Sequence, residues 1–123
     1  MTTITSADAP AFDVGGTHVV GLASPSRGAA QTSAWRLTLD PGSSSPRHSL
    51  SHEEVFVALH GRARAEYDDG AEEVPAGGAL IIPAGVEFTL VNPGDEPFHA
   101  VVAVPIGVQA TVDGERVDPP WAV

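Results

Sequence analysis

Hydrophobic residues fall in short runs along this chain, and polar residues alternate with them in the clearest of these runs. Trp35, Leu37 and Leu39 alternate with Arg36 and Thr38, which is the two-residue period of a strand that buries one face. Clusters of glycine, proline, asparagine and aspartate separate the runs and are typical of turns. The pattern predicts seven strands, at Thr17–Leu22, Ala34–Leu39, Val55–Leu59, Ala63–Tyr67, Ala79–Ile82, Phe88–Val91 and Phe98–Val104.

The predicted elements indicate an all-β domain. No segment keeps apolar residues at the 3.6-residue spacing of a helix, and many short strands at even spacing are typical of a sandwich or barrel. With 123 residues the chain is expected to form one domain. Residues 1–13 are small and polar, so we expect a flexible tail there and the domain at residues 14–123. Trp121 follows two prolines, and we expect it on a stiff arm packed on the barrel or on a second subunit.

Charge and composition exclude several kinds of function. Six arginines and no lysine stand against sixteen acidic residues, so the formal net charge is −10. Such a surface repels phosphate backbones and anionic lipid, and we expect neither nucleic acid nor membrane as a partner. The absence of cysteine and lysine excludes thiolate and Schiff-base chemistry. Because the chain shows no signal-peptide pattern and no apolar run long enough to span a bilayer, we expect a soluble, cytoplasmic protein.

Two motifs give the chain a resemblance to a known family. The first runs from Gly42 through His48 and Glu54 to Gly61, and the second runs from Gly77 through Pro83 and Gly85 to Asn92. In spacing and order these motifs resemble those of the cupin family, over residues of about 35–105. The resemblance implies a double-stranded β-helix, or jelly-roll, barrel. The glycines and the proline are expected at chain reversals, where positive φ or a fixed φ is needed.

The resemblance is incomplete at the positions that bind metal in cupins. The family holds its metal with two histidines and a glutamate from the first motif and one histidine from the second. His48 and Glu54 match two of these positions, but Leu50 and Phe88 occupy the other two. Two protein ligands seldom hold a divalent ion, and two histidines with one carboxylate are the usual minimum for non-haem iron. The resemblance therefore implies a lost or weakened metal site.

Two further histidines are candidates to complete a metal site. His52 has the same parity as His48 and Glu54 on an extended segment, and His99 lies on the last long predicted strand. A metal held by His48, His52 and Glu54, with His99 as a further recruit, would be Fe, Mn, Ni or Zn, and would predict a dioxygenase or isomerase. In the alternative interpretation His52 is an exposed loop residue, and His48 forms a hydrogen bond with Glu54.

The apolar replacements also predict a binding site. If Leu50 and Phe88 point inward, they form with Phe56 an apolar pocket in which His48 and Glu54 supply orienting hydrogen bonds, a composition typical of small-molecule sites. We therefore predict that a small apolar or aromatic molecule binds at these five residues. In the alternative these side chains simply fill the barrel. A carboxyl group buried there would have a raised pKa and could serve acid–base chemistry near neutral pH.

A third hypothesis is a structural or regulatory barrel that acts through its dimer surface. The resemblance implies a homodimer, because small cupins commonly pair through their sheets. Apolar residues compatible with such a contact are Val19, Val20, Leu22 and Trp121. Of the three hypotheses we favour the small-molecule-binding barrel, and the sequence leaves open whether the protein is an enzyme.

Overall fold

The fold is built almost entirely of short β-strands. The computed structural model describes residues 1–123, and its only helix is one 3-10 turn, η1, at Pro25–Arg27. The strands are β1 (Ala11–Val14), β2 (Thr17–Ala23), β3 (Thr32–Leu39), β4 (Ser49–Leu50), β5 (Glu54–His60), β6 (Arg62–Tyr67), β7 (Gly70–Pro75), β8 (Ala79–Ile82), β9 (Thr89–Val91), β10 (Phe98–Pro105), β11 (Ala110–Val112) and β12 (Glu115–Val117). The predicted all-β class is confirmed, and no helix has the length and apolarity needed to cross a membrane.

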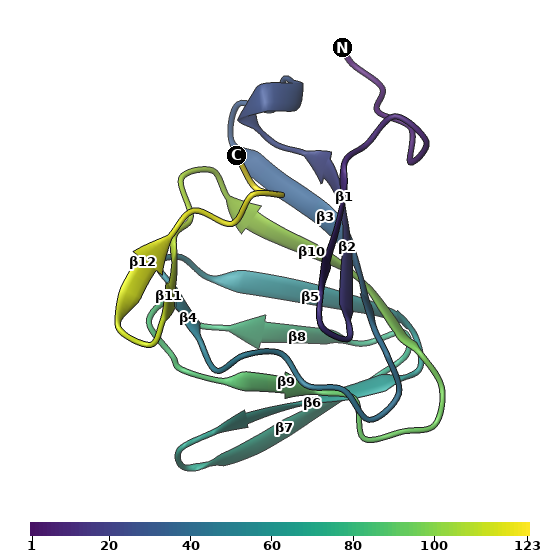
Figure 1. The fold of residues 1–123 in the computed structure, drawn as a ribbon, viewed down its shortest axis with the longest axis vertical. Coiled ribbons are helices and arrows are strands. Elements are labelled where there is room, and N and C mark those ends of the chain that lie inside the picture. The colour runs from purple at the N-terminus through teal and green to yellow at the C-terminus, as the bar shows by residue number, and fades with distance from the viewer.

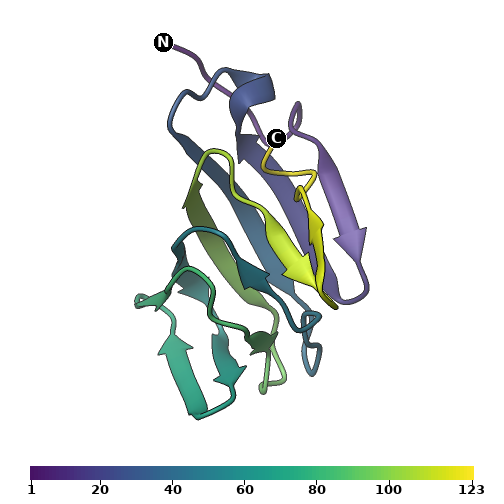
Figure 2. The same cartoon turned by 90° about the vertical axis from the view of Figure 1, so that its left-hand side faces the viewer.

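Three sheets enclose the interior of the barrel. The largest has six strands in the order β1-β2-β3-β10-β5-β8, and two three-stranded sheets have the orders β12-β11-β4 and β7-β6-β9. Figure 1 shows the β12-β11-β4 sheet at one side of the barrel and β6, β7 and β9 at the end away from the chain termini. In Figure 2 the β11–β12 hairpin lies in front of the six-stranded sheet. This arrangement is a jelly-roll barrel.

All seven predicted strands are present, with small differences at their ends. The five other strands carry weak or no apolar alternation. For example, β7 buries only Val74, and every residue of β12 is exposed. These strands form because their backbones pair with neighbours, and hydrophobic periodicity does not report such pairing.

The expected N-terminal tail needs a correction. Residues 11–13 belong to β1, which pairs antiparallel with β2 and places Phe12 opposite Val19. The ring of Phe12 packs edge-on against that of Trp121, with centroids 5.9 Å apart. Backbone pairing with β2 and the partial burial of Phe12 together dock this segment on the barrel.

Strand alternation places the core inside the barrel. In β10 the side chains of Phe98, Ala100, Val102 and Val104 are buried, while the residues between them are only half-buried. The neighbouring β3 repeats the pattern, and Leu37 pairs with Ala100 across the two strands. This is the period of two that the sequence shows around Trp35.

The glycine after β5 shows why the first motif ends as it does. Gly61 has φ of +73°, and a Cβ atom there would lie 2.5 Å from the carbonyl oxygen of Pro97. Both the positive φ and the close approach exclude other residues without rearrangement. The predicted reversal at Gly61 is therefore confirmed, and Gly85 likewise has a positive φ, of +79°.

Candidate functional site

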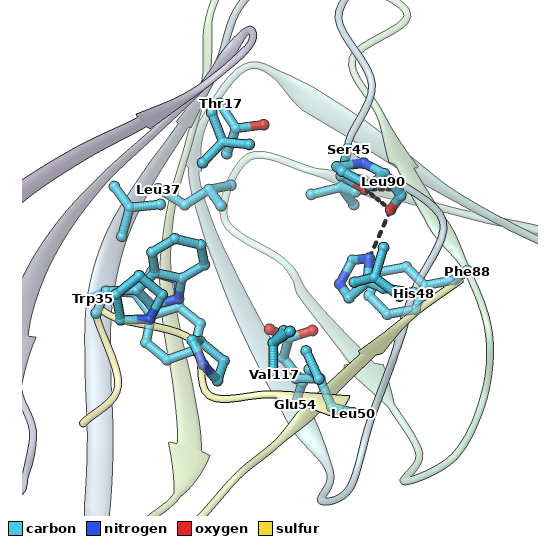
Figure 3. A pocket seen from close by; sticks show the side chains of 18 of the residues that line it. Thr17, Trp35, Leu37, Ser45, His48, Leu50, Glu54, Phe88, Leu90 and Val117 are labelled. Atoms are coloured by element: carbon cyan, nitrogen blue, oxygen red, sulfur yellow. Dashed lines mark hydrogen bonds between the residues drawn. The ribbon is translucent and has the colours of Figure 1, made fainter. Parts of the chain in front are cut away.

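A cavity of about 230 Å³ lies inside the barrel. Twelve of its nineteen lining residues are hydrophobic, and no lysine or arginine is among them. Figure 3 shows side chains from strands on both sides of the barrel converging on this space. The lining residues are Val14, Thr17, Val19, Trp35, Leu37, Ser45, Pro46, His48, Leu50, Glu54, Phe56, Phe88, Leu90, Ala110, Val112, Val117, Pro119, Pro120 and Trp121.

The five binding residues proposed from the sequence all line this cavity. Phe88 is fully buried, and its backbone forms an antiparallel bridge with His48 through hydrogen bonds of 2.9 and 3.0 Å. Its ring lies 4.6 Å from the imidazole of His48 and 6.4 Å from the ring of Phe56. Leu50, in β4, is 6% exposed. The two apolar replacements therefore face the interior, and they do so without filling it.

The imidazole of His48 is fixed by the backbone. Its Nδ1 lies 2.7 Å from the carbonyl oxygen of Pro46, and because a carbonyl can only accept, Nδ1 carries the proton. Burial lowers the pKa of His48, so the ring is neutral at neutral pH and its Nε2 is an acceptor. The hydrogen bond between His48 and Glu54 that the sequence suggested is not formed, because His48 is bonded to Pro46 and Glu54 Oε1 has no partner.

Glu54 is the buried acidic group of the site. It begins β5, where its backbone pairs with Ile82, and it is only 4% exposed. Burial away from water raises the pKa of its carboxyl group to about 8. At neutral pH the group is therefore mostly an uncharged carboxylic acid, which can donate one hydrogen bond and accept another. The raised pKa expected from the sequence is confirmed.

Two residues that were not proposed as site residues from the sequence add unpaired polar atoms to the lining of the cavity. The hydroxyl of Thr17 and the indole nitrogen of Trp121 are buried and, like Glu54 Oε1, have no hydrogen-bond partner. Thr17 lies two residues before Val19 on β2, so both side chains face the interior. This alternation was the feature of the sequence from which an inward-facing Thr17 could have been predicted. The ring of Trp121 packs edge-on against that of Trp35, with centroids 6.2 Å apart. Of the two positions expected for Trp121, on its own barrel or on a second subunit, the structure has the first.

The C-terminal arm that carries Trp121 is held by hydrogen bonds from the barrel. The guanidinium of Arg27 donates to the carbonyl of Trp121 at 3.0 Å, and the hydroxyl of Ser33 donates to the carbonyl of Ala122 at 2.8 Å. Ser33 is fully buried, so this contact is shielded from water. These bonds fix the arm as one wall of the cavity.

The proposed metal ligands are not brought together. His52 lies in an exposed bend with its Nδ1 2.8 Å from Ser51 Oγ, and it does not line the cavity. The Nδ1 of His99 is hydrogen-bonded to Oγ1 of Thr38, 3.0 Å away. His99 is one of the half-buried residues of β10, which alternate with the side chains that face the interior. No group of three or more histidine, cysteine, aspartate or glutamate side chains could hold a metal ion. What remains at the family's metal positions is His48 and Glu54, and these two protein ligands alone do not fit a divalent ion.

Solved structures of similar shape are cupins and related barrels. A polyketide cyclase, RemF, from Streptomyces resistomycificus has a TM-score of 0.76 and 23% sequence identity, over 96% of this chain and 82% of that chain. A sugar phosphate isomerase of the cupin superfamily from Silicibacter pomeroyi has a TM-score of 0.66 and 23% identity, over 81% of this chain and 67% of that chain. At these identities the similarity establishes the fold alone.

Sequence comparison gives the family. A Cupin 2 conserved barrel domain protein from Salinispora arenicola is 32% identical with a TM-score of 0.55, over 61% of this chain and 63% of that chain. No curated protein sequence is detectably similar to the chain. The family model of the cupin domain matches residues 35–104, which is more than half of the chain and contains both motifs. The chain therefore belongs to the cupin domain family.

Proposed function

We propose that the protein binds a small, largely apolar or aromatic molecule in the barrel cavity, through its own side chains and not through a bound metal. The observation that carries the proposal is the wall of the cavity itself. Leu50 and Phe88 stand at two family metal positions and face an open, predominantly hydrophobic space. Concave, mostly apolar sites with a few polar groups are the usual form of small-molecule sites.

The size of the cavity limits the ligand. A cavity of roughly 150 Å³ is enough to hold a benzene ring, whereas sites for drug-sized molecules begin at roughly 300 Å³. At about 230 Å³ the cavity is suited to a molecule of one or two rings. Four aromatic side chains contribute to its wall, and they offer stacked or edge-on contacts to such a ring. They are Trp35, Phe56, Phe88 and Trp121.

The absence of cations in the wall favours one kind of ligand over another. A phosphorylated sugar needs arginine, lysine or a metal to balance its charge, and no lysine or arginine lines this cavity. The polyketide cyclase among the structural neighbours is the better functional analogy, because an apolar wall suits a molecule of low polarity. The metal-dependent enzyme that the sequence left as an alternative is disfavoured on a separate ground, because no group of three or more possible metal ligands comes together.

Titration with naphthalene tests the proposal. We expect saturable binding to the purified protein, followed by calorimetry, and a metal content well below one ion per chain. Ala110→Phe places a ring in the cavity and should weaken binding at least tenfold, because Ala110 is buried in the wall. Ala71→Phe, at an exposed position of β7, is the matched control and should leave binding unchanged. Absence of saturable binding, or equal binding by the Ala110→Phe protein, would contradict the proposal.

We also propose that two copies associate through the outer face of β5 and β8. Val57, Leu59 and Ile81 are exposed there by 43%, 59% and 59%, on neighbouring strands. Adjacent apolar side chains exposed on one face are typical of contact surfaces. The residues suggested from the sequence are less suitable, because Val19 is in the core and Trp121 packs within its own chain.

A further inference from the structure

Three buried polar atoms without partners belong to this one cavity. They are the hydroxyl oxygen of Thr17, Oε1 of Glu54 and the indole nitrogen of Trp121. No other buried side-chain nitrogen or oxygen atom of the chain lacks a hydrogen-bond partner. Buried polar groups are nearly always paired, and each unpaired one costs stability. Their coincidence in one cavity therefore points to a bound molecule that supplies the partners.

The three atoms come from distant parts of the chain. Thr17 begins β2, Glu54 begins β5, and Trp121 lies on the C-terminal arm. Figure 3 shows Thr17 and Glu54 at opposite ends of the ring of labelled side chains, with the carboxyl oxygens of Glu54 toward the space between. Hydrophobic side chains such as Leu37 occupy the wall between them. A ligand that meets both ends needs polar atoms at its periphery and an apolar middle.

The hydrogen-bonding capacity of each of the three groups limits which functional groups the ligand can carry. An indole N–H can only donate, so Trp121 requires an acceptor on the ligand. A hydroxyl such as that of Thr17 can donate or accept, and a carboxyl oxygen of Glu54 can accept a hydroxyl proton. Oxygen substituents on a ring meet all three requirements. A carboxylate or phosphate ligand is disfavoured, because no lysine or arginine lines the cavity and the one acidic side chain there is Glu54.

We infer that the cavity selects an uncharged aromatic molecule bearing hydroxyl or carbonyl oxygens, of the phenol or naphthol type, and that Thr17, Glu54 and Trp121 bind those oxygens. The inference rests on the proposed function and adds the chemical class of the ligand. The aromatic and aliphatic side chains supply affinity for the ring, and the three polar groups distinguish oxygenated rings from plain hydrocarbons. Leaving a buried polar group without a partner is costly, so an unsubstituted ring is expected to bind more weakly than an oxygenated one.

Three probes of similar size test the inference at pH 7, namely naphthalene, 2-naphthol and the cation of 2-naphthylmethylamine. We expect 2-naphthol to bind at least tenfold more tightly than naphthalene, as one or two hydrogen bonds to buried groups provide. In ¹H–¹⁵N spectra the indole N–H signal of Trp121 should shift with 2-naphthol and much less with naphthalene. The spectrum of the Trp121→Phe protein lacks that signal, and this difference distinguishes the indole signal of Trp121 from that of Trp35.

Nearly isosteric variants separate polar recognition from packing. Thr17→Val and Trp121→Phe should each weaken 2-naphthol binding about three- to tenfold and leave naphthalene binding nearly unchanged. Thr38→Val is the matched control, because Thr38 is bonded to His99 and does not line the cavity. The amide spectrum of each variant shows whether it is folded.

The outcomes distinguish the two proposals. If neither naphthalene nor 2-naphthol binds, the proposed function fails and this inference fails with it. If naphthalene binds as tightly as 2-naphthol and the variants affect both equally, the inference alone is overturned. Tightest binding of the ammonium probe would also overturn it, because Glu54 would then act as a counter-ion in an aromatic cage.

Discussion

Glu54 is held in an environment that opposes its charge. The backbone pairing of β5 with β8 fixes its position opposite Ile82, and the cavity offers Oε1 no hydrogen bond. An ionised carboxylate there would lack both water and a cation, so the proton is retained and the pKa rises to about 8. Such a residue lowers the stability of the empty barrel and is better explained by a bound molecule than by folding.

Glu54→Gln should stabilise the protein in a pH-dependent way. The ordinary pKa of 4.5 applies to the unfolded chain and about 8 to the folded one, so the unfolded chain gains stability by ionising as the pH rises between these values. The advantage of glutamine should therefore be small near pH 4, reach up to about 3 kcal/mol at pH 7, and level off above pH 8. Urea unfolding of both proteins at several pH values measures it.

The control for this series is Glu53→Gln. Glu53 is half of the same acidic pair in the sequence but is not buried, so its substitution should have a small effect. A stability difference between wild type and Glu54→Gln that does not vary with pH would contradict the assignment of a raised pKa.

The motif spacing located some cavity residues and missed others for a physical reason. His48, Leu50 and Glu54 lie within one short segment, and that segment's turn and strand geometry determines which way they face. Thr17 and Trp121 reach the same cavity only because β2 pairs with β3 and the arm packs on Trp35. The alternation of β2 shows that Thr17 faces inward, but only contacts between distant residues bring it and Trp121 to the same cavity.

At the scale of the elements, burial by alternation explains which strands could be predicted. β3 and β10 alternate buried and less buried side chains along eight residues, so their pattern is readable from the sequence. The two-residue β4 and the exposed β12 are too short or too polar to give a pattern. They are nevertheless needed here, because Leu50 and Val117 from these strands line the cavity.

His18 joins β1 to the barrel and should do so in a pH-dependent way. Its Nδ1 contacts Asp13 of β1, and its Nε2 lies 3.1 Å from Asp40 at the end of β3. The hydrogen bond to Asp13, followed by that to Asp40, raises the pKa of His18 above 6.5. The stabilisation is therefore fully present below pH 6.5 and is lost as the pH rises through the raised pKa.

His18→Gln should accordingly lower the melting temperature at pH 6 and have little effect at pH 9. The side chain of His18 is 41% exposed, so the contribution is below about 1 kcal/mol and the shift is about 1 to 3 °C. Asp13→Asn removes the partner and should reproduce the loss at pH 6. An equal effect of His18→Gln at both pH values would show that packing, and not the charge, joins the strand.

At the scale of the whole molecule, charge and hydrophobic surface act in opposite directions on self-association. The formal charge of −10 makes two copies repel each other, and the repulsion is strongest at low ionic strength. The apolar outer face of β5 and β8 favours contact, and β8 is an edge strand whose free side adds unpaired backbone groups. Association through this face would leave the cavity intact, because Leu59 and Ile81 do not line it.

Leu59→Glu should convert the proposed dimer to a monomer. The substitution removes an exposed apolar contact and adds a negative charge to a face that meets its own copy, so we expect the dimer dissociation constant to rise at least tenfold. Size-exclusion chromatography with light scattering at several protein concentrations measures the change, and added salt should strengthen the wild-type dimer by screening the net charge. Val123→Glu adds the same charge at an exposed position of the C-terminal end and should leave the dimer unchanged. A wild-type protein that stays monomeric at tens of micromolar, or a Leu59→Glu protein with an unaltered dimer, would show that this face is not the contact.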